Sequence, residues 1–176
     1  RHLVLERQAQ TDALTGLANR RGFMDALARA TAADEGPVPL ALLVIDIDHF
    51  KRVNDQHGHA TGDAILQRVA AHVARVAGSG AIVSRYGGEE FVVALRGHDL
   101  VRAGTIAERI RNSIGVTFDP GSDLPSVTVS IGVAAGLSDD LEALIADADC
   151  ALYQAKNDGR NRVMLADGAL IYSAAA

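Results

Sequence analysis

The sequence predicts an α/β (α+β) domain in which one central, mixed sheet of about five strands is covered by helices. Three observations carry this prediction. Helix-like and strand-like segments alternate along the chain, and the apolar run Leu40–Ile45 has the length and continuity of a strand buried on both faces. The pair Gly87-Gly88 stands between two apolar segments, which is typical of a β-hairpin with a two-residue turn.

Helices and strands can be placed along the chain from hydrophobic periodicity and capping residues. Residues 1–13 are predicted to form a polar connecting helix that ends near Gly16, and Asn19 is suited to cap a helix running to about residue 33. After the strand, residues 49–63 are expected to form a short helical turn and a loop, and Thr61 to cap a helix over 63–77. The remaining expected elements are strands at 81–86 and 89–95, a helix at 99–115, a loop at 117–125, a strand at 127–134, a helix at 141–156, a turn at 157–161 and a strand at 163–165.

Composition and length limit the classes of protein that fit. A chain of 176 residues is long enough for one domain with a substantial core. No apolar run approaches the roughly 20 residues of a membrane span, and the net charge of −5 gives no general affinity for nucleic acid. The single cysteine, Cys150, excludes an internal disulfide and fits a reducing, cytoplasmic compartment. Its helical flanks predict a buried or half-buried thiol.

The chain opens with Arg1 rather than Met, which indicates a fragment of a longer protein with a missing upstream sensory or regulatory domain. We therefore expect a linker or signalling helix over 1–13, a catalytic domain over 14–170 and a tail over 171–176. This fragment itself is expected to make no membrane contact, although the whole protein could be anchored through the missing N-terminal region.

Carboxylates gather where the predicted central strand ends and where the hairpin turns. Asp46-Ile47-Asp48 closes the apolar run, and Glu89 and Glu90 follow the two glycines. Adjacent acids repel each other, and neighbouring strand residues point to opposite faces, so Glu89 and Glu90 should meet different surroundings. If the hairpin pairs beside the central strand, Asp46 and a turn glutamate can meet. Carboxylate and carbonyl oxygens there would suit Mg²⁺ or Mn²⁺.

Other polar residues are consistent with nucleotide chemistry, because magnesium held by one or two carboxylates usually completes its shell with water and phosphates. Lys51 and the pair Lys156 and Arg160 can balance phosphate charge. Asn54 and Asp63 flank a glycine-containing loop, and an aspartate can accept from both the ring N–H and the amino group of guanine. Taken singly, each of these residues is equally compatible with a solvated charge, a turn or a helix start.

The stretch Arg85-Tyr86-Gly87-Gly88-Glu89-Glu90-Phe91 resembles the signature of the GGDEF family, the bacterial diguanylate cyclase domains. Three further stretches resemble motifs of this family in the same order, namely 12–21, 46–63 and 148–161. The resemblance covers about residues 11–165, and the ordered set of motifs is highly specific.

The resemblance implies that two GTP molecules condense to cyclic di-GMP and two pyrophosphates between two antiparallel copies of the domain. It also implies a fold similar to the polymerase-palm and nucleotidyl-cyclase cores, with the hairpin at the active site. The metal would be bound by Asp46, the Ile47 carbonyl and Glu89, and Glu89 would help to deprotonate the attacking hydroxyl. The implied catalytic residues are Glu89, Lys51 and Glu90. The implied GTP-binding residues are Phe50, Lys51, Asn54, His59, Asp63, Gly87, Gly88, Lys156 and Arg160.

The sequence departs from the family at one place. Many members carry an Arg-x-x-Asp product-inhibition site before the hairpin, where this chain has Gly78-Ser79-Gly80-Ala81. We therefore expect no such site, and Arg109, which lies where a secondary product contact often occurs, is expected to be a solvated helix residue. The rival hypotheses are a catalytically silent GTP-binding or dimerisation module, and a cyclase that uses adenine. The hairpin acids and the guanine contacts are all present, which argues against the first, and Asp63 argues against the second.

Overall fold

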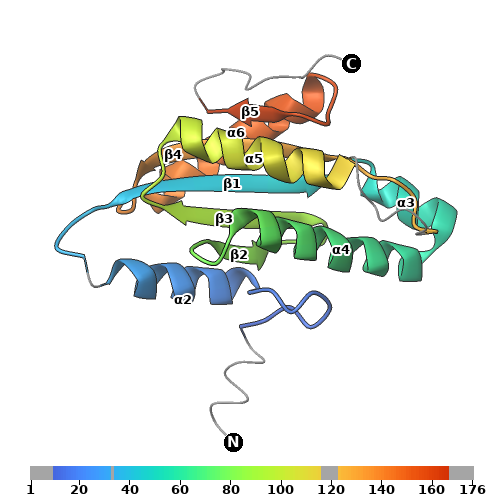
Figure 1. Cartoon of the computed structure of the whole chain (residues 1–176), viewed down its shortest axis with the longest axis horizontal. Helices are drawn as coiled ribbons and strands as arrows, with labels where there is room; N and C mark the ends of the chain where they lie inside the picture. Colours follow the sequence, from blue (N-terminus) through green and yellow to red (C-terminus); the bar gives the residue numbers. More distant parts are fainter. Residues whose placement is uncertain (1–9, 33, 116–122, 167–176) are drawn as a thin grey trace, which may run out of the picture.

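A computed structural model describes residues 10–32, 34–115 and 123–166 of the chain (Figure 1). Its helices and strands are, in order, α2 (Arg20–Thr31), β1 (Pro39–Ile47), α3 (Phe50–His57), α4 (His59–Ala77), β2 (Ile82–Arg85), β3 (Glu90–Arg96), α5 (Leu100–Gly115), β4 (Val129–Leu137), α6 (Leu141–Asn157) and β5 (Val163–Leu165). Among the described residues no helix has both the length and the apolar content that crossing a bilayer would require.

The five strands form a single sheet in the order β2-β3-β1-β4-β5, so the apolar run of β1 is its central strand. All neighbouring pairs are antiparallel except β4 and β5, which are parallel. The predicted mixed five-stranded sheet is therefore confirmed, and so is the expectation that the hairpin strand β3 pairs beside β1.

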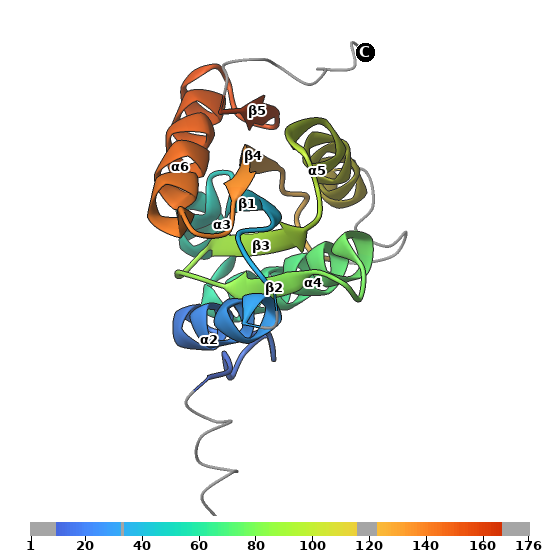
Figure 2. The same ribbon diagram turned by 90° about the vertical axis from the view of Figure 1, so that its left-hand side faces the viewer.

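Helices cover both faces of the sheet, with α4 and α5 on one face and α2 and α6 on the other (Figure 2). Alternate residues of β1 feed the two cores. Leu43 and Ile45 pack with α4 and α5, whereas Leu42 and Val44 pack with α2 and α6. This two-sided burial explains why β1 has a continuous apolar run rather than an alternating pattern. With both faces covered, the polar residues of β1 lie at its C-terminal end.

The start of the described chain differs from the expected connecting helix. Residues 1–9 lie outside the described part, and residues 10–13 are not helical, because Thr11 forms an isolated bridge with Ala18. Gly16 takes a left-handed φ of 72° inside this turn rather than at a helix end. Asn19 does cap α2 as predicted, accepting a hydrogen bond from the Gly22 amide at 3.0 Å.

The polar segment after β1 is more helical than the sequence predicts. Residues 50–57 form the two-turn helix α3, and α4 begins at His59 rather than near Asp63. The predicted Thr61 cap is wrong. Thr61 lies inside the first turn of α4, and its hydroxyl donates to the His57 carbonyl at 2.9 Å. Gly58, with φ of 83°, joins the two helices in a backbone conformation that favours glycine.

Two smaller expectations also need correction or lie outside the described chain. Cys150 is exposed on α6 rather than buried or half-buried. The first part of the predicted loop at 117–125, residues 117–122, lies outside the described residues, as do residues 167–176, which include the predicted tail at 171–176.

Candidate active site

The pairing of β1 with β3 brings the predicted acids together at one end of the sheet. Asp46 is directly opposite Glu90 in the register, and the Ile47 amide donates to the Glu89 carbonyl at 3.3 Å. Ile47 itself is paired with Val129 of β4. Asp46, Ile47 and Glu89, the three predicted metal-binding residues, are therefore neighbours in the fold although about a quarter of the chain separates Ile47 from Glu89.

The hairpin turn is wider than the predicted two-residue turn. The amides of Tyr86 and Gly87 both donate to the Glu90 carbonyl, at 2.8 and 3.2 Å, which leaves Gly87, Gly88 and Glu89 in the loop. Neither glycine adopts a φ between +20° and +160°, so the turn does not explain why glycine is required. A Cβ added to Gly88 would meet nothing within 4 Å. A Cβ added to Gly87, in contrast, would lie 3.1 Å from the Glu90 Oε2. Open space is therefore found beside Gly88, where it is compatible with a ligand lying against the backbone.

Arg85 fixes this loop from the preceding strand. Its Nε and Nη2 donate to the Gly88 carbonyl at 3.1 and 2.7 Å, and its Nη1 lies 3.2 Å from both carboxylate oxygens of Asp12. Asp12 in turn accepts from the Thr15 amide and hydroxyl, at 2.9 and 2.7 Å. The first motif of the described chain and the hairpin are thus joined by one side chain. Sequence reasoning missed this role of Arg85, for which the only signal is its place beside the two glycines.

A groove of about 510 Å³ runs beside the hairpin loop and collects most of the predicted substrate-binding residues. Its lining comes from α3, the start of α4 and the hairpin, and consists of Phe50, Lys51, Asn54, Asp55, His59, Asp63, Leu66, Arg85, Gly88 and Glu89. Glu89 lies on the wall of the groove and next to Asp46, so the groove and the acidic strand end meet at this residue. Asp55, Leu66 and Arg85 are lining residues that the sequence did not predict.

Asn54 is held between the two helices that form one wall of this groove. A Cβ built on Gly62 of α4 would lie 1.9 Å from the Asn54 Oδ1 and 3.2 Å from the Phe50 ring. Gly62 is buried, and its lack of a side chain allows the amide of Asn54 to occupy its present position. Gly62 therefore has a steric function that is distinct from any turn.

Replacing Gly62 with alanine is expected to displace the Asn54 amide without unfolding the domain, because the atom in conflict is the end of a side chain that can rotate. If Asn54 contacts the guanine base, the KM for GTP should rise by about tenfold, the value of one lost hydrogen bond to a buried polar group. Steady-state kinetics with circular dichroism would measure both effects. Gly80→Ala is the matched control, since nothing lies within 4 Å of its added Cβ. An unchanged KM in Gly62→Ala would contradict the steric account.

The predicted phosphate-binding cations have different positions. Lys156 of α6 pairs directly with Asp46, with 2.9 Å between Nζ and Oδ2. Arg160 follows α6; burial raises the pKa of Asp46, and the positive charge of Arg160 is one of the smaller effects that oppose this rise. Lys51 is exposed on α3 and lines the groove. Lys156 and Arg160 therefore lie on the Asp46 side of the site, and Lys51 lies on the groove side.

The carboxyl groups of Asp46, Glu89 and Glu90 all have pKa values above their ordinary ones. Burial raises the pKa of Asp46, and it outweighs the opposing effect of the Lys156 ammonium. Burial and then the negative charge of Asp46 raise the pKa of Glu89. Burial, followed by the charges of Asp149, Asp46 and Glu89, raises the pKa of Glu90. The site therefore carries an excess of negative charge that a cation between Asp46 and Glu89 would relieve.

The donor set fits a hard divalent cation. Two carboxylates and a backbone carbonyl are oxygen ligands of the kind that Mg²⁺ and Mn²⁺ use, and Mg²⁺ commonly takes one or two carboxylates together with phosphates. Within residues 10–32, 34–115 and 123–166 no group of three or more His, Cys, Asp and Glu side chains could hold a metal by itself. A metal held by Asp46, Glu89 and the Ile47 carbonyl would therefore complete its coordination with water or with phosphate oxygens.

Metal binding should therefore depend on pH in a defined direction. Because the pKa values of Asp46 and Glu89 are raised in the folded state, these groups hold more protons there than in the unfolded chain. Their contribution to stability is favourable at low pH and is lost as pH rises from near 3.8 and 4.5 through the raised values. Mn²⁺ should therefore raise the melting temperature more at about pH 7.5 than at about pH 4.5, since it binds the ionised pair. Asp46→Asn should abolish this difference, and an equal Mn²⁺ effect at both pH values in the wild type would contradict the prediction.

Glu90 lies in a second groove of about 310 Å³, with Arg20, Val44, Tyr86, Val92, Glu142, Ile145 and Asp149. The expectation that Glu89 and Glu90 meet different surroundings is therefore confirmed. The guanidinium of Arg20 lies 5.0 Å from the centre of the Tyr86 ring, and that ring packs edge-on against Phe23. Glu90 faces the α2 and α6 side of the sheet, which leaves Glu89 as the hairpin acid next to the first groove.

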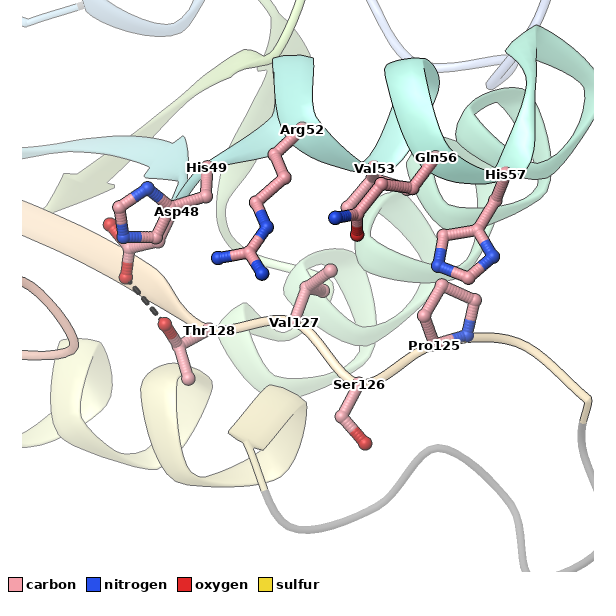
Figure 3. Close-up of a pocket in the computed structure, with 10 residues that line it drawn as sticks. All are labelled: Asp48, His49, Arg52, Val53, Gln56, His57, Pro125, Ser126, Val127 and Thr128. Atoms are coloured by element: carbon pink, nitrogen blue, oxygen red, sulfur yellow. Dashed lines mark hydrogen bonds between the residues drawn. The ribbon is translucent and has the colours of Figure 1, made fainter.

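A third groove, of about 280 Å³, lies on the other side of α3 (Figure 3). His49, Arg52, Gln56 and His57 line it from α3 and its first cap, opposite residues 125–128. Asp48 is also at this groove and is nearly fully buried, with 5% of its surface exposed. The two acids at the end of β1 thus have separate environments, since Asp48 does not line the groove that contains Glu89.

The segment where many family members carry the product-inhibition motif has a simple structure. Residues 78–81 form the turn between α4 and β2, and a Cβ added to Gly78 or Gly80 would meet nothing within 4 Å. Arg109 is exposed on α5. Neither place offers an arginine and an aspartate at the predicted spacing.

Taken together, the sheet order, the acidic strand end and the neighbouring groove define the class of protein: a domain with a nucleotidyl-cyclase-like fold and a metal-compatible acidic site. The family model described as "Diguanylate cyclase, GGDEF domain" matches residues 9–162. This chain belongs to that family, as its resemblance to the GGDEF motifs predicts.

Individual relatives support this assignment. The chain is 44% identical over 164 residues to response regulator PleD of Caulobacter vibrioides. The aligned region covers 89% of this chain and 36% of PleD. It is 43% identical over 171 residues to diguanylate cyclase DgcM of Escherichia coli, which covers 92% of this chain and 40% of DgcM. The crystal structure of the coiled coil and GGDEF domain of DgcB from Caulobacter crescentus, in complex with c-di-GMP, superposes with a TM-score of 0.83. It is 40% identical and covers 93% of this chain and 90% of that one. The chain spans well under half the length of the two curated relatives, PleD and DgcM.

Proposed function

We propose that this domain is an active diguanylate cyclase that condenses two GTP molecules to cyclic di-GMP and releases two pyrophosphates. The observation that carries the proposal is the position of Glu89, which lies beside Asp46 and also lines the groove that contains Asn54 and Asp63. A metal-compatible acid pair and a guanine-compatible groove thus share one residue. DgcM, which is named a diguanylate cyclase, is similar over 92% of this chain.

The proposed binding mode divides the groove by chemistry. Asn54 and Asp63 contact the guanine, because an aspartate accepts from two adjacent guanine donors that adenine lacks. Phe50 and His59 line the same wall. Gly87 and Gly88 leave room for the nucleotide, and Lys156 and Arg160 bind the terminal phosphates near Asp46.

The proposed reaction joins two such sites. Two domains face each other antiparallel, and the 3′-hydroxyl of each GTP forms a bond to the α-phosphorus of the other as the bond to pyrophosphate breaks. Glu89 accepts the hydroxyl proton or assists its removal, and Lys51 stabilises the charge that develops on the phosphoryl oxygens. Mg²⁺ or Mn²⁺, held by Asp46, the Ile47 carbonyl and Glu89, would supply charge stabilisation and lower the pKa of the attacking hydroxyl. Glu90 has a supporting role beside this site.

The experiment that tests the proposal is incubation of the domain with GTP, with ATP and with both, in the presence of Mg²⁺, followed by separation of the products. Cyclic di-GMP from GTP alone is expected, with no dinucleotide containing adenine. The rate should grow with the square of protein concentration if the dimer is transient and linearly if it is stable. Since GTP is supplied inside the cell, we place the site in the cytoplasm. Binding of GTP without any dinucleotide at high protein concentration would favour the silent regulatory module instead.

Addition of cyclic di-GMP is expected to leave the rate unchanged except by competition with GTP. The reason is that residues 78–81 offer neither the arginine nor the aspartate of the product-inhibition motif. Initial rates at saturating GTP, measured against increasing cyclic di-GMP, would test this. Potent noncompetitive inhibition would contradict the prediction and would make Arg109 the first residue to replace.

A further inference from the structure

Asp48 is a buried acid for which the proposed reaction has no use. It lies two residues beyond Asp46, and both of its carboxylate oxygens are occupied by donors. Oδ1 accepts a hydrogen bond from the Ser130 hydroxyl at 2.7 Å. Oδ2 accepts from the Thr128 hydroxyl at 2.6 Å (Figure 3) and from the backbone N–H of Asn161 at 3.0 Å. A carboxylate satisfied in this way is already compensated and is poorly suited to bind a metal.

The contact with Asn161 joins the end of β1 to an unusual turn. Arg160 and Asn161 have φ values of 63° and 46°, so two consecutive residues other than glycine are in the left-handed region. Such a conformation persists only where the surroundings impose it. Here the Asn161 amide is held by Asp48, the Asn161 Oδ1 accepts from Arg111 of α5 at 2.8 Å, and the Arg160 carbonyl accepts from Arg162 at 3.1 Å.

We infer that Asp48 is a positioning residue, which holds the 160–161 turn against the strand end and thereby directs Arg160 toward the phosphates of the substrate. The inference rests on the proposed function, because it uses the phosphate role of Arg160. Asp48 connects three segments, since Thr128 precedes β4, Ser130 lies within it, and Asn161 follows α6. The same carboxylate therefore fixes the position of the turn relative to Asp46, two residues earlier on β1.

The test compares two ligands that differ in their terminal phosphates. The probes are α,β-methylene GTP, which keeps the terminal phosphates but cannot release pyrophosphate, and GMP, which lacks them. Calorimetry with Mg²⁺ would give their affinities for the wild type, Asp48→Asn, Arg160→Ala and the double variant. In Asp48→Asn the new amide NH₂ opposes the donors around it, so the turn should lose its anchor. The methylene analogue is expected to bind about tenfold more weakly and GMP equally well.

The double variant distinguishes positioning from an independent contribution. If Asp48 acts through Arg160, Asp48→Asn should cause no further loss once Arg160 is alanine. Ser130→Ala removes one of the donors to Asp48 and is the milder variant to use if Asp48→Asn folds poorly. It should weaken the binding of the methylene analogue and leave the binding of GMP unchanged. Asp139→Asn, an exposed acid after β4, is the matched control, and melting temperatures are recorded for every variant.

Three results would overturn the inference: unchanged analogue binding in Asp48→Asn, equal losses for the analogue and GMP, or additive losses in the double variant. Two further results would also test the proposed roles on which the inference rests. If Arg160→Ala binds the analogue as tightly as the wild type, the phosphate role of Arg160 fails and the inference fails with it. If no variant and not even the wild type binds either guanine ligand, the proposed function itself is refuted.

Discussion

Replacement of Glu89 with glutamine is expected to abolish cyclic di-GMP formation while leaving the fold intact. Glu89 lies next to Asp46 and lines the groove, so the substitution removes one of two carboxylates from the metal-compatible pair and the proposed proton acceptor. Loss of both functions should lower kcat by roughly a thousandfold or more. The measurement is product formation from GTP with Mg²⁺ at saturating substrate.

The control for this substitution is Glu35→Gln, which makes the same chemical change at an exposed residue before β1. Its activity should match the wild type. Because burial and the charge of Asp46 raise the pKa of Glu89, its neutralisation should not destabilise the metal-free domain. Substantial turnover by Glu89→Gln would refute the metal role of Glu89, whereas a fall in melting temperature would refute the electrostatic account.

Replacement of Gly132 with alanine is expected to lower the stability of the fold more than the alanine substitutions at Gly62 or Gly80. A Cβ on Gly132 of β4 would lie 2.0 Å from the Ala148 carbonyl oxygen and 2.3 Å from the Leu152 amide nitrogen, both backbone atoms of α6. Backbone atoms cannot rotate away, so the helix would have to move off the sheet. We expect a loss of about 3 kcal/mol or more in the free energy of unfolding, at the upper end for overpacking.

Chemical denaturation would measure this loss, with Gly80→Ala as the control that leaves the unfolding free energy within about 0.5 kcal/mol of the wild type. Since α6 also carries Lys156, which pairs with Asp46, the Lys156 ammonium group should be displaced from Asp46 in any Gly132→Ala protein that still folds. A denaturation midpoint equal to that of the wild type would show that α6 tolerates the movement.

Most of the fold could be predicted because its signals are local. The continuous apolar run of β1 indicated a two-sided strand, and Asn19 indicated the start of α2, and both predictions are confirmed. Local signals failed where long-range contacts decide the structure. Nothing in the neighbourhood of Gly132 indicates that a helix backbone will lie against it, and His49, at φ of 57°, gives no sequence signal of its left-handed conformation before α3.

The candidate site shows the same division. The sequence places two acids at the end of β1, but it cannot separate their uses. Asp46 is left beside Lys156, while Asp48 is occupied by Thr128 and Ser130, about 80 residues away. Their different surroundings follow from the pairing of β1 with β4, which only the folded chain reveals. The hairpin glycines were predicted as turn residues and, from the family resemblance, as GTP-binding residues. Their backbone angles do not require glycine, and of the two only Gly88 has open space where a Cβ would lie.

The ion pair between Asp12 and Arg85 links two places that are 73 residues apart in sequence. Through Arg85, the Gly88 carbonyl next to Glu89 is anchored to the turn at the start of the described chain rather than to the sheet alone. Leu14 and Leu17 of the same segment pack against the core beneath α4 and α5, and the Arg85 amide donates to the Ala18 carbonyl at 2.9 Å, so the segment contacts both the sheet and the hairpin loop. We therefore expect a displacement of the chain at Asp12 to shift the Gly88 carbonyl, one residue before Glu89, through the side chain of Arg85.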